Sequence, residues 1–511
     1  MSVCLKMMWQ LSSMSESVLD RIDQLDIEAQ QDSSAAVEDT YIIPECEVFE
    51  VPPNLRARWT DHFPIDKGLE LGLHHRTLKK SKIEDFKVEI ARIVHWKLRA
   101  TTENRSWKSF AQDVVEDVHK ARRSYSATSL SCTFTDEDVQ NLLTLDALFL
   151  VVFFMYINGR SFLLEEFKVL AGRLEHVVSK AIDYGDFFLV ENQVPLYLLE
   201  SVIRQLCMID KERVESTFDV ESKVTDELDL ILIIAILHLY PFKYAHDTRT
   251  MSSSNGMLLG HFYCSQQYSQ SSRDRLQAHL FATYPLQPLE KSLRSCHHLL
   301  HCLYTVICGH LLPFEVKGNN QSHGPLDIIP SATRLRAVGI RAMGSVAALS
   351  GITLRGRGYF RSANLDLPKV VLYDYSESAF HNLSLYEQLA SNGECGDIRC
   401  YLQCMNSLCI NESDCQFLNE QGVIINHTGN DSLQGMWGRT LKGVYTPYPS
   451  TSWIECYQEI HRYQNSRFRR WRQEFWTLFF AKPWTLVSVL AATVLLFLTA
   501  TQTWYAAFPH Y

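Results

Sequence analysis

The chain has 511 residues, enough for one large core or for two to three modest domains. Its hydrophobic fraction of 46% and charged fraction of 21% are those of a globular protein, which excludes a disordered chain and a multi-span membrane protein. The formal net charge of -9 argues against nucleic-acid binding, because such proteins carry a basic face.

Residues 1–40 are predicted to form a flexible, acidic N-terminal arm. Carboxylates recur along this stretch, and large apolar side chains are few after Leu25. The apolar patch at the start is interrupted by Lys6 and Gln10, which is not the pattern of a signal peptide. A globular body is expected to follow over residues 41–466.

The body is predicted to be mainly α-helical, as one large unit with a few short strands. Apolar residues recur every three or four positions between 163 and 181, which predicts a helix with one face on the core. Segments 145–157 and 228–240 are very apolar but shorter than the ~18–20 residues of a membrane crossing. They are expected to be buried helices beginning near Asp146 and Asp229, since a carboxylate suits a helix N-terminus.

Two polar stretches are expected to be loop insertions in this body. Residues 250–272 are rich in Ser, Gln and Asn, and residues 317–325 have the sequence KGNNQSHGP. Because exposed loops tolerate change, these loops are the candidate contact surfaces for a protein partner.

A polar triplet, Glu191-Asn192-Gln193, lies between the apolar runs FFLV and VPLYLL, with Asp186 before it and Pro195 after it. The preferred interpretation is a structural motif in which the carboxylate and amides satisfy backbone groups where a helix starts or breaks. The alternative is that Glu191 belongs to an active site, although no nucleophile or base can be matched to it from sequence. No catalytic residue is therefore predicted.

The segment CHHLLHCLYTVICGH places His297 and His301 four residues apart, a spacing by which two imidazoles on a helix can bind a metal. The surrounding residues are apolar, so histidines bonded to carbonyl groups in the core are the preferred interpretation. Five cysteines between 395 and 415 lack the C-x2-C pair of zinc sites. No metal or cofactor is predicted, and the cysteines are expected to be reduced unless the body faces an oxidising compartment.

The strongest signal lies at the C-terminus, where 22 residues from Trp484 to Tyr505 carry no charge. As a helix they would span ~33 Å, enough for the ~30 Å hydrocarbon layer of a bilayer. Trp484, Trp504 and Tyr505 stand at the two ends, as in interfacial aromatic belts. A single transmembrane helix is predicted over residues 483–505, with a short tail over 506–511. A glycolipid-anchor signal and a buried C-terminal helix are the alternatives.

Residues 467–482 are basic and aromatic, the pattern of a helix that lies among lipid headgroups, and a plain continuation of the body's last helix is the alternative. Lys and Arg precede the predicted membrane helix and none follows it, which predicts that the body is cytoplasmic. The membrane is expected to be the plasma membrane or an endomembrane. Since six residues follow Tyr505, tail-anchored insertion after translation is expected. Six N-glycosylation sequons, including Asn382 and Asn411, would matter only for a lumenal or extracellular body. The basic residues before the predicted membrane helix are Arg467, Arg469, Arg470, Arg472 and Lys482.

Several ordered stretches resemble the plant family of the domain of unknown function 247, from about Val48 to the C-terminus. DYGDFFLVENQVPLYLLE is the most specific, since it is similar to the family pattern D-hh-LENQ-hP-hhhL. The others are VFEVPPNLR, LDALFL, IIPSATRLRAVGI, LYEQ, QGVIINH and the apolar C-terminus. The resemblance implies a plant-specific protein with a C-terminal anchor and no settled biochemical activity. Some grass members of the family are implicated in pollen self-incompatibility.

These observations favour a membrane-anchored, non-enzymatic interaction or recognition protein, in signalling or in self-incompatibility-type recognition. Its expected partners are the lipid bilayer and an unidentified protein. The alternative is a membrane-bound enzyme, hydrolase-like or metal-dependent, that uses the Glu191 region or the His297/His301 cluster. A packed triplet would favour the first hypothesis, and an open pocket with converging acid and histidine groups would favour the second.

Overall fold

Helix α7, Asp136–Ile157, runs through the centre of the N-terminal half of the body. Carboxylates fill its first turn and suit the positive end of the helix dipole, and nearly all later residues are buried. It packs against α3, α4, α9 and α10. The prediction of a buried helix over 145–157 is confirmed, but its expected start at Asp146 is wrong because the helix begins ten residues earlier.

The computed structural model describes residues 48–56, 68–74, 81–100, 105–125, 134–157, 165–177 (except 171 and 176), 182–211, 220–239, 295–308, 329–349 (except 346–348), 352–356, 362–390, 396–428, 433, 435–441, 451–465 and 483–507. The predicted acidic arm, the loop insertions at 250–272 and 317–325, and the basic segment 467–482 lie outside these residues.

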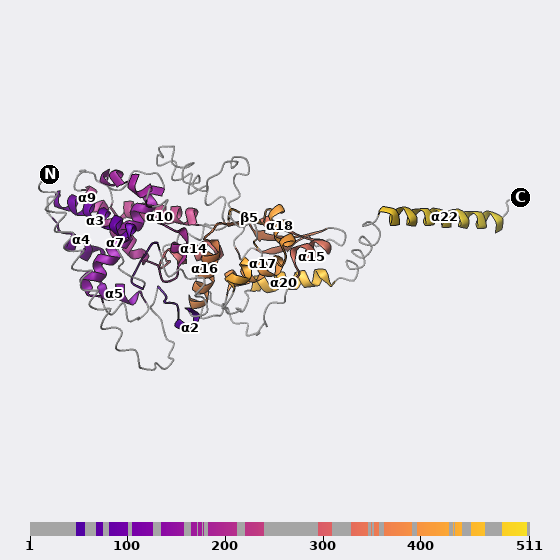
Figure 1. Cartoon of the computed structure of the whole chain (residues 1–511), viewed down its shortest axis with the longest axis horizontal. Helices are drawn as coiled ribbons and strands as arrows, with labels where there is room; N and C mark the ends of the chain where they lie inside the picture. The colour runs from indigo at the N-terminus through magenta and orange to yellow at the C-terminus, as the bar shows by residue number, and fades with distance from the viewer. Residues whose placement is uncertain are drawn as a thin grey trace.

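Helices surround α7 in the N-terminal half (Figure 1). In α3, Ile83, Phe86, Ile90 and Val94 recur at helical spacing and are buried, as an amphipathic helix requires. The elements of this half are α2 (Pro53–Arg56), α3 (Lys82–Ala100), α4 (Trp107–Val114), α5 (Val118–Arg123), η1 (Glu165–Leu170), η2 (Tyr184–Phe188), α9 (Leu196–Lys211), α10 (Val220–Leu239) and α14 (Leu299–Cys308).

Two further sequence-based helix predictions need correction in this half. Helix α10 contains the apolar run 228–239 but begins at Val220, so Asp229 lies inside it rather than at its start. Residues 165–170 form the 3-10 helix η1 where one α-helix over 163–181 was predicted. The apolar face is nevertheless buried, since Phe167 and Leu174 have no exposed surface. Periodicity marks the buried face, but it does not separate an α-helix from a shorter, tighter turn.

The C-terminal half of the body adds two small sheets to helices. Strand β3 (Ala363–Pro368) is central in the first sheet, with β1 (Ile340–Ser345) parallel on one side and β2 (Thr353–Arg355) antiparallel on the other. Gly339 has a φ of 90° and turns the chain from α15 (Ala332–Ala337) into β1, a conformation that favours glycine. Strands β4 (Val370–Leu372) and β5 (Ile424–Asn426) form a parallel pair.

The remaining helices of this half are α16 (Ser376–Ala390), α17 (Asp397–Leu408), α18 (Glu412–Glu420), α19 (Met436–Thr440) and α20 (Thr451–Gln464). Helix α16 packs against η2, α17 and α19 and therefore connects the two halves. The predicted fold class, a mainly helical body with a few short strands and a C-terminal apolar helix, is confirmed.

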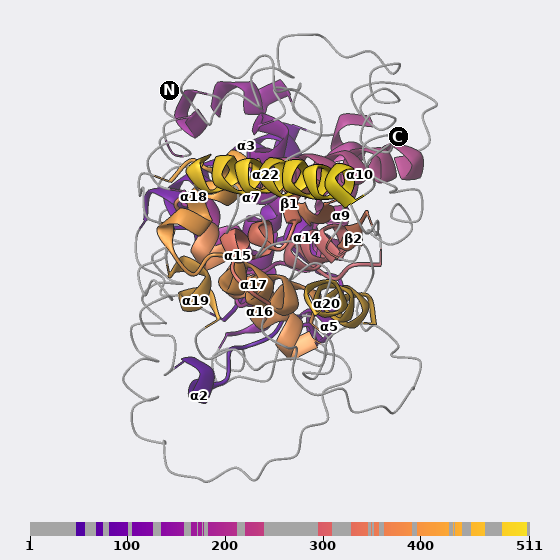
Figure 2. The same cartoon turned by 90° about the vertical axis from the view of Figure 1, so that its right-hand side faces the viewer.

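Helix α22 (Pro483–Ala507) is long, apolar and separate from the body (Figure 1). Its stretch Val487–Ala506 is long and apolar enough to cross a membrane, and none of it is buried. Figure 2, viewed from this end, shows α22 crossing in front of the body. Helix α7 passes the same length and composition test, but 72% of its apolar stretch is buried, which identifies it as a core helix.

Asp414 joins α18 to α15 and caps α18. Its carboxylate accepts hydrogen bonds from the Thr333 amide and hydroxyl at 2.9 and 2.6 Å, and from the Asn411 amide at 3.1 Å. Burial acts to raise the pKa of Asp414, but these hydrogen bonds to the charged form outweigh it and lower the pKa.

We expect Asp414→Asn to lower the free energy of unfolding by about 1–2 kcal/mol at pH 7, since it weakens a helix cap and charge-assisted bonds. A carboxyl whose pKa is lowered by folding contributes stability above its unfolded pKa and loses it as the pH falls through the folded value. The difference from the wild type should therefore shrink as the pH falls below ~4. Thermal unfolding at a series of pH values measures this, with the exposed Asp374→Asn as control. A difference that is independent of pH would contradict the prediction.

Candidate functional site

The triplet Glu191-Asn192-Gln193 forms a buried turn between η2 and α9. All three side chains are almost wholly enclosed, as is Asp186 in η2. Pro195 immediately precedes the first residue of α9 and pairs across a β-bridge with the chain ahead of α14. The five residues singled out from the sequence therefore lie in one short stretch at the junction of several helices.

Glu191 holds the first described segment of the chain, residues 48–56. Its Oε1 accepts a hydrogen bond from the Val51 amide at 2.8 Å, and the Arg56 guanidinium forms an ion pair with the same oxygen. Glu191 is buried, whereas the Arg56 side chain is 40% exposed. The carboxylate is thus paired with a cation that reaches it from the surface.

Asn192 and Asp186 hold a second segment, residues 68–74. The Leu71 amide donates to Asn192 Oδ1 at 2.6 Å, while Asn192 Nδ2 donates to the Leu69 carbonyl at 3.0 Å. The Leu69 amide donates to Asp186 Oδ2 at 2.9 Å. Asn192 Nδ2 also donates to the Asp186 carbonyl at 2.9 Å. The two side chains therefore pair with segment 68–74 much as a neighbouring β-strand would.

Gln193 connects the turn to α14. Its Nε2 donates to the Phe187 and Leu189 carbonyls at 2.9 Å each. Its Oε1 accepts from the Leu300 amide in the first turn of α14 at 3.1 Å. The Tyr125 hydroxyl donates to the Gln193 carbonyl at 3.0 Å. Gln193 thereby provides an acceptor for an amide that has no partner within its own helix.

Segment 68–74 is also held from the opposite side by a buried ion pair. Lys87 and Asp146 have no exposed side-chain surface and lie 2.8 Å apart. The second oxygen of Asp146 accepts from the Gly72 amide at 2.9 Å. Gly72 has a φ of 71°, and a Cβ there would lie 2.5 Å from the Gln193 carbonyl oxygen. Only glycine fits at this position without displacing the triplet.

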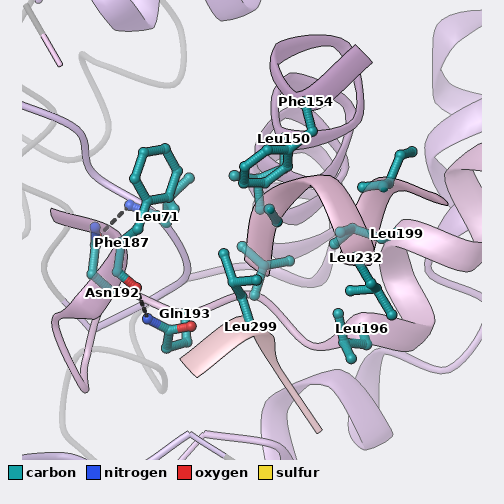
Figure 3. Close-up of a pocket in the computed structure, with 13 residues that line it drawn as sticks. Leu71, Leu150, Phe154, Phe187, Asn192, Gln193, Leu196, Leu199, Leu232 and Leu299 are labelled. Atoms are coloured by element: carbon teal, nitrogen blue, oxygen red, sulfur yellow. Dashed lines mark hydrogen bonds between the residues drawn. The ribbon is translucent and has the colours of Figure 1, made fainter. Parts of the chain in front are cut away.

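A small cavity borders the triplet. Figure 3 shows Asn192 and Gln193 on one side of it, with Leu150, Phe154 and Leu199 among the apolar residues on the other. The space available to water in this cavity is ≈ 10 Å³, about what one water molecule requires. A cavity of this size has no room for an organic substrate.

The histidine cluster lies at the start of α14. The helix begins at Leu299, so the expectation that His297 and His301 share a helix is wrong. The His297 amide donates to His301 Nδ1, and the His301 amide donates to His298 Nδ1, each at 3.2 Å. Two imidazoles are thus used to satisfy backbone amides near the helix start. Among the described residues, no group of three His, Cys, Asp or Glu side chains is placed to hold a metal ion.

A second buried carboxylate, Glu387 of α16, links α14 to α17. Its Oε1 accepts from the Tyr304 hydroxyl at 2.9 Å and the Ile398 amide at 3.0 Å. Its Oε2 accepts from both the amide and the side-chain Nε of Arg399 at 3.1 Å. Burial raises the pKa of Glu387, and the adjacent Arg399 acts against this effect. Burial likewise raises the pKa of Tyr304 well above its usual value.

Sequence reasoning did not identify the Lys87–Asp146 and Glu387–Arg399 pairs as interactions. Asp146 was placed at a helix start, and Glu387 was noted only within the LYEQ stretch. One signal was available: both carboxylates stand in runs of mainly apolar residues, where a charge needs a partner. The identity of the partner could not be inferred, because Lys87 lies 59 residues from Asp146 along the chain.

The basic residues predicted to precede the membrane helix, Arg467 to Lys482, lie outside the described residues. Trp484, Trp504 and Tyr505 lie within α22, and their side chains are exposed. The helix continues two residues beyond the predicted end, to Ala507.

A family model for the domain of unknown function 247, described as "Plant protein of unknown function", matches residues 48–498. The chain belongs to this family. UPF0481 protein At3g47200 of Arabidopsis thaliana is 24% identical over 399 residues, which cover 76% of this chain and 71% of that protein. Putative UPF0481 protein At3g02645 of the same plant is 25% identical over 180 residues, covering 34% of this chain and 32% of that protein. No solved structure matches the chain.

Family membership agrees with the resemblance drawn from the ordered motifs, and it assigns no activity. The matched range contains the triplet, both buried ion pairs and the greater part of α22.

Proposed function

We propose that this chain is a membrane-anchored, non-enzymatic interaction protein that acts in recognition or signalling, with α22 as a single membrane-spanning anchor. One observation carries the proposal: the stretch Val487–Ala506 is apolar and none of it is buried, although burying it would be strongly favourable in water. Twenty residues of helix span ~30 Å, the thickness of the hydrocarbon layer. Lipid is the environment that suits such a surface.

The non-enzymatic part of the proposal is supported by the use of the candidate catalytic groups. The Glu191 carboxylate pairs with Arg56 and a backbone amide, and the amide side chains of Asn192 and Gln193 bond backbone groups. The adjoining cavity has space for about one water molecule. An enzyme would need a site open to its substrate. The body is then a rigid support that presents surface to a protein partner.

A single charge in the middle of α22 tests the anchor. Leu496→Arg should move the chain from the membrane pellet to the soluble fraction, because arginine at the centre of a membrane helix costs ~2.5–3.5 kcal/mol on insertion scales. Val169→Arg, at a body position that is 82% exposed, is the matched control and should leave the distribution unchanged. Membrane flotation from plant microsomes measures both. Equal flotation of wild type and Leu496→Arg would overturn the anchor.

The orientation of the body is tested by glycosylation in the same microsomes. A cytoplasmic body, as the basic residues before the anchor predict, gives no glycosidase-sensitive shift in mass and is digested by added protease. Asn411 is exposed at the start of α18, whereas Asn382 is buried, so Asn411 is the acceptor to follow. A shift abolished by Asn411→Gln, with a protease-protected body, would place the body on the lumenal side and contradict the proposed orientation.

A further inference from the structure

A basic region stands out in a chain that is acidic as a whole. Residues 331–370 hold seven Lys and Arg residues and one carboxylate, Asp366, whereas the whole chain has a formal net charge of -9. The described residues of this region form α15, the three-stranded sheet β1-β3-β2 and the start of β4. Positive charge concentrated in one part of an acidic chain indicates that this part faces an anionic partner.

The sheet β1-β3-β2 has one buried face and one exposed face. The middle row of the buried face consists of Ala342, Leu354 and Leu365. On the other face, Arg341 of β1 and Arg355 of β2 both pair with Asn364 of β3, and all three residues are exposed. Paired residues on neighbouring strands point to the same face. Since strands lie ~4.8 Å apart, the two arginines flank Asn364 with their Cα atoms ~10 Å apart.

The next row of the exposed face contains Met343, Asp366 and Thr353. Asp366 forms an ion pair with Arg355, whose side chain nevertheless remains 71% exposed. Arg341 forms no ion pair with any described residue. The face therefore carries more positive than negative charge, with the Asn364 amide between its two cations. Phosphate oxygens are acceptors that arginine binds especially well.

This face lies close to the point where the chain leaves the body for the membrane helix. Helix α20 packs against β2 and is the last described element before α22. Figure 1 shows α15 and α20 at the end of the body nearer to α22. Residues 465–482 connect α20 to α22, and fully extended they would span at most ~60 Å. The exposed face of the sheet is therefore tethered near the bilayer that α22 would enter.

We propose that the exposed face of the β1-β3-β2 sheet binds the phosphate groups of anionic lipids and docks the body on the bilayer that anchors α22. This inference rests on the proposed function, because it requires the anchor and a body on the anionic cytoplasmic side. Arg341 and Arg355 would bind headgroup phosphates, with the Asn364 amide donating between them. Each arginine near an anionic surface contributes about fivefold to the docking equilibrium, so docking would be reversible. Salt would weaken it by screening.

Hydroxyl-radical footprinting of the full-length chain in lipid vesicles tests the docking. One set of vesicles contains phosphatidylcholine alone, and the other contains phosphatidylcholine and phosphatidylserine in equal parts. Met343 reports on the proposed face and is 37% exposed, and Met208 of α9, which is 41% exposed, is the internal control. Tandem mass spectrometry measures the oxidation of each. We expect Met343 oxidation to be severalfold lower in the phosphatidylserine vesicles and to recover at high salt, while Met208 reacts equally in both.

A double substitution tests the role of the two arginines. Arg341→Gln with Arg355→Gln should make Met343 oxidation equal in the two lipids, because the loss of both arginines weakens docking roughly thirtyfold. Arg173→Gln is the matched control and should keep Met343 protected. Arg173 lies in the N-terminal half, is 70% exposed and, like Arg355, pairs with one carboxylate, Glu89. Protection of Met343 that survives the double substitution would overturn the proposal.

The same vesicles separate a failure of docking from a failure of the anchor. A chain that is recovered with neither kind of vesicle has no membrane anchor, which would overturn the proposed function and the docking together. A chain that is recovered with both, but has Met343 equally oxidised in both, is anchored without docking, which would overturn this inference alone. Protection of Met343 by added polyglutamate, without protection by phosphatidylserine, would assign the face to an acidic protein surface instead.

Discussion

Asn192→Ala is expected to lower the free energy of unfolding by about 3–5 kcal/mol, because each buried backbone group left without a partner costs ~1–3 kcal/mol. The substitution removes the acceptor of the Leu71 amide and the donor to the Leu69 carbonyl, both of which are enclosed. It also removes the bond to the Asp186 carbonyl. Since domains are stable by only ~5–15 kcal/mol, the thermal midpoint should fall clearly, and little folded protein should accumulate on expression.

The matched control is Asn419→Ala, at an exposed position in α18. A surface substitution of this kind changes stability by no more than ~0.5 kcal/mol in either direction. Thermal unfolding of the two variants and the wild type, in the same detergent, gives the comparison. Asn192→Ala unfolding at the same temperature as Asn419→Ala would show that segment 68–74 is held by something other than Asn192.

This comparison also bears on the choice between a structural and a catalytic triplet. A catalytic amide could be removed with loss of function and little loss of stability, since active sites often sacrifice stability for function. A structural amide that bonds two segments from distant parts of the sequence cannot be removed without weakening the fold. Asn192 lies more than 120 residues from Leu69 and Leu71 along the chain, so its contacts are of the second kind.

The runs of apolar residues predicted the core helix α7 and the exposed helix α22, because such a run is visible in the sequence without knowledge of its neighbours in the fold. The run 145–157 is too apolar to be exposed and too short to cross a membrane, so a core helix was the remaining choice. The charge-free stretch after Trp484 predicted α22 in the same way, and its exposure separates it from α7. In both cases length and composition predict an apolar helix, and burial separates the core helix from the exposed one.

Helix starts and long-range polar pairs were not predictable on the same basis. Residues 136–144 are polar enough to be mistaken for a loop, yet they extend α7, where Trp107 and Lys108 of α4 bond Asn141 and Glu137. Asp146 was therefore assigned to a cap when it lies inside the helix, where Lys87 neutralises it. Whether Asp146 caps a helix or lies inside one depends on which helix packs against it, and a single sequence does not contain this information. The polar triplet was located from sequence, but its partners in segments 48–56 and 68–74 were not.

Glu387→Leu is expected to cost about 3–5 kcal/mol, because it leaves the Arg399 guanidinium buried without its carboxylate. Arg399 is 1% exposed and Glu387 is fully enclosed, so water cannot replace the lost partner. The same change leaves the Ile398 amide and the Tyr304 hydroxyl without their acceptor. Because Tyr304 belongs to α14 and Arg399 to α17, the loss should loosen the N-terminal half from the C-terminal half of the body.

Glu377→Leu on the same helix is the matched control, since Glu377 pairs with Arg439 at 2.7 and 2.8 Å near the surface. Exposed ion pairs contribute only ~0–1 kcal/mol, so this variant should unfold close to the wild type. The double substitution Glu387→Leu with Arg399→Leu should recover part of the loss, because two apolar side chains replace an unpaired charge. Thermal unfolding of the four chains tests both statements. If Glu387→Leu is no less stable than Glu377→Leu, the buried pair does not hold α14, α16 and α17 together.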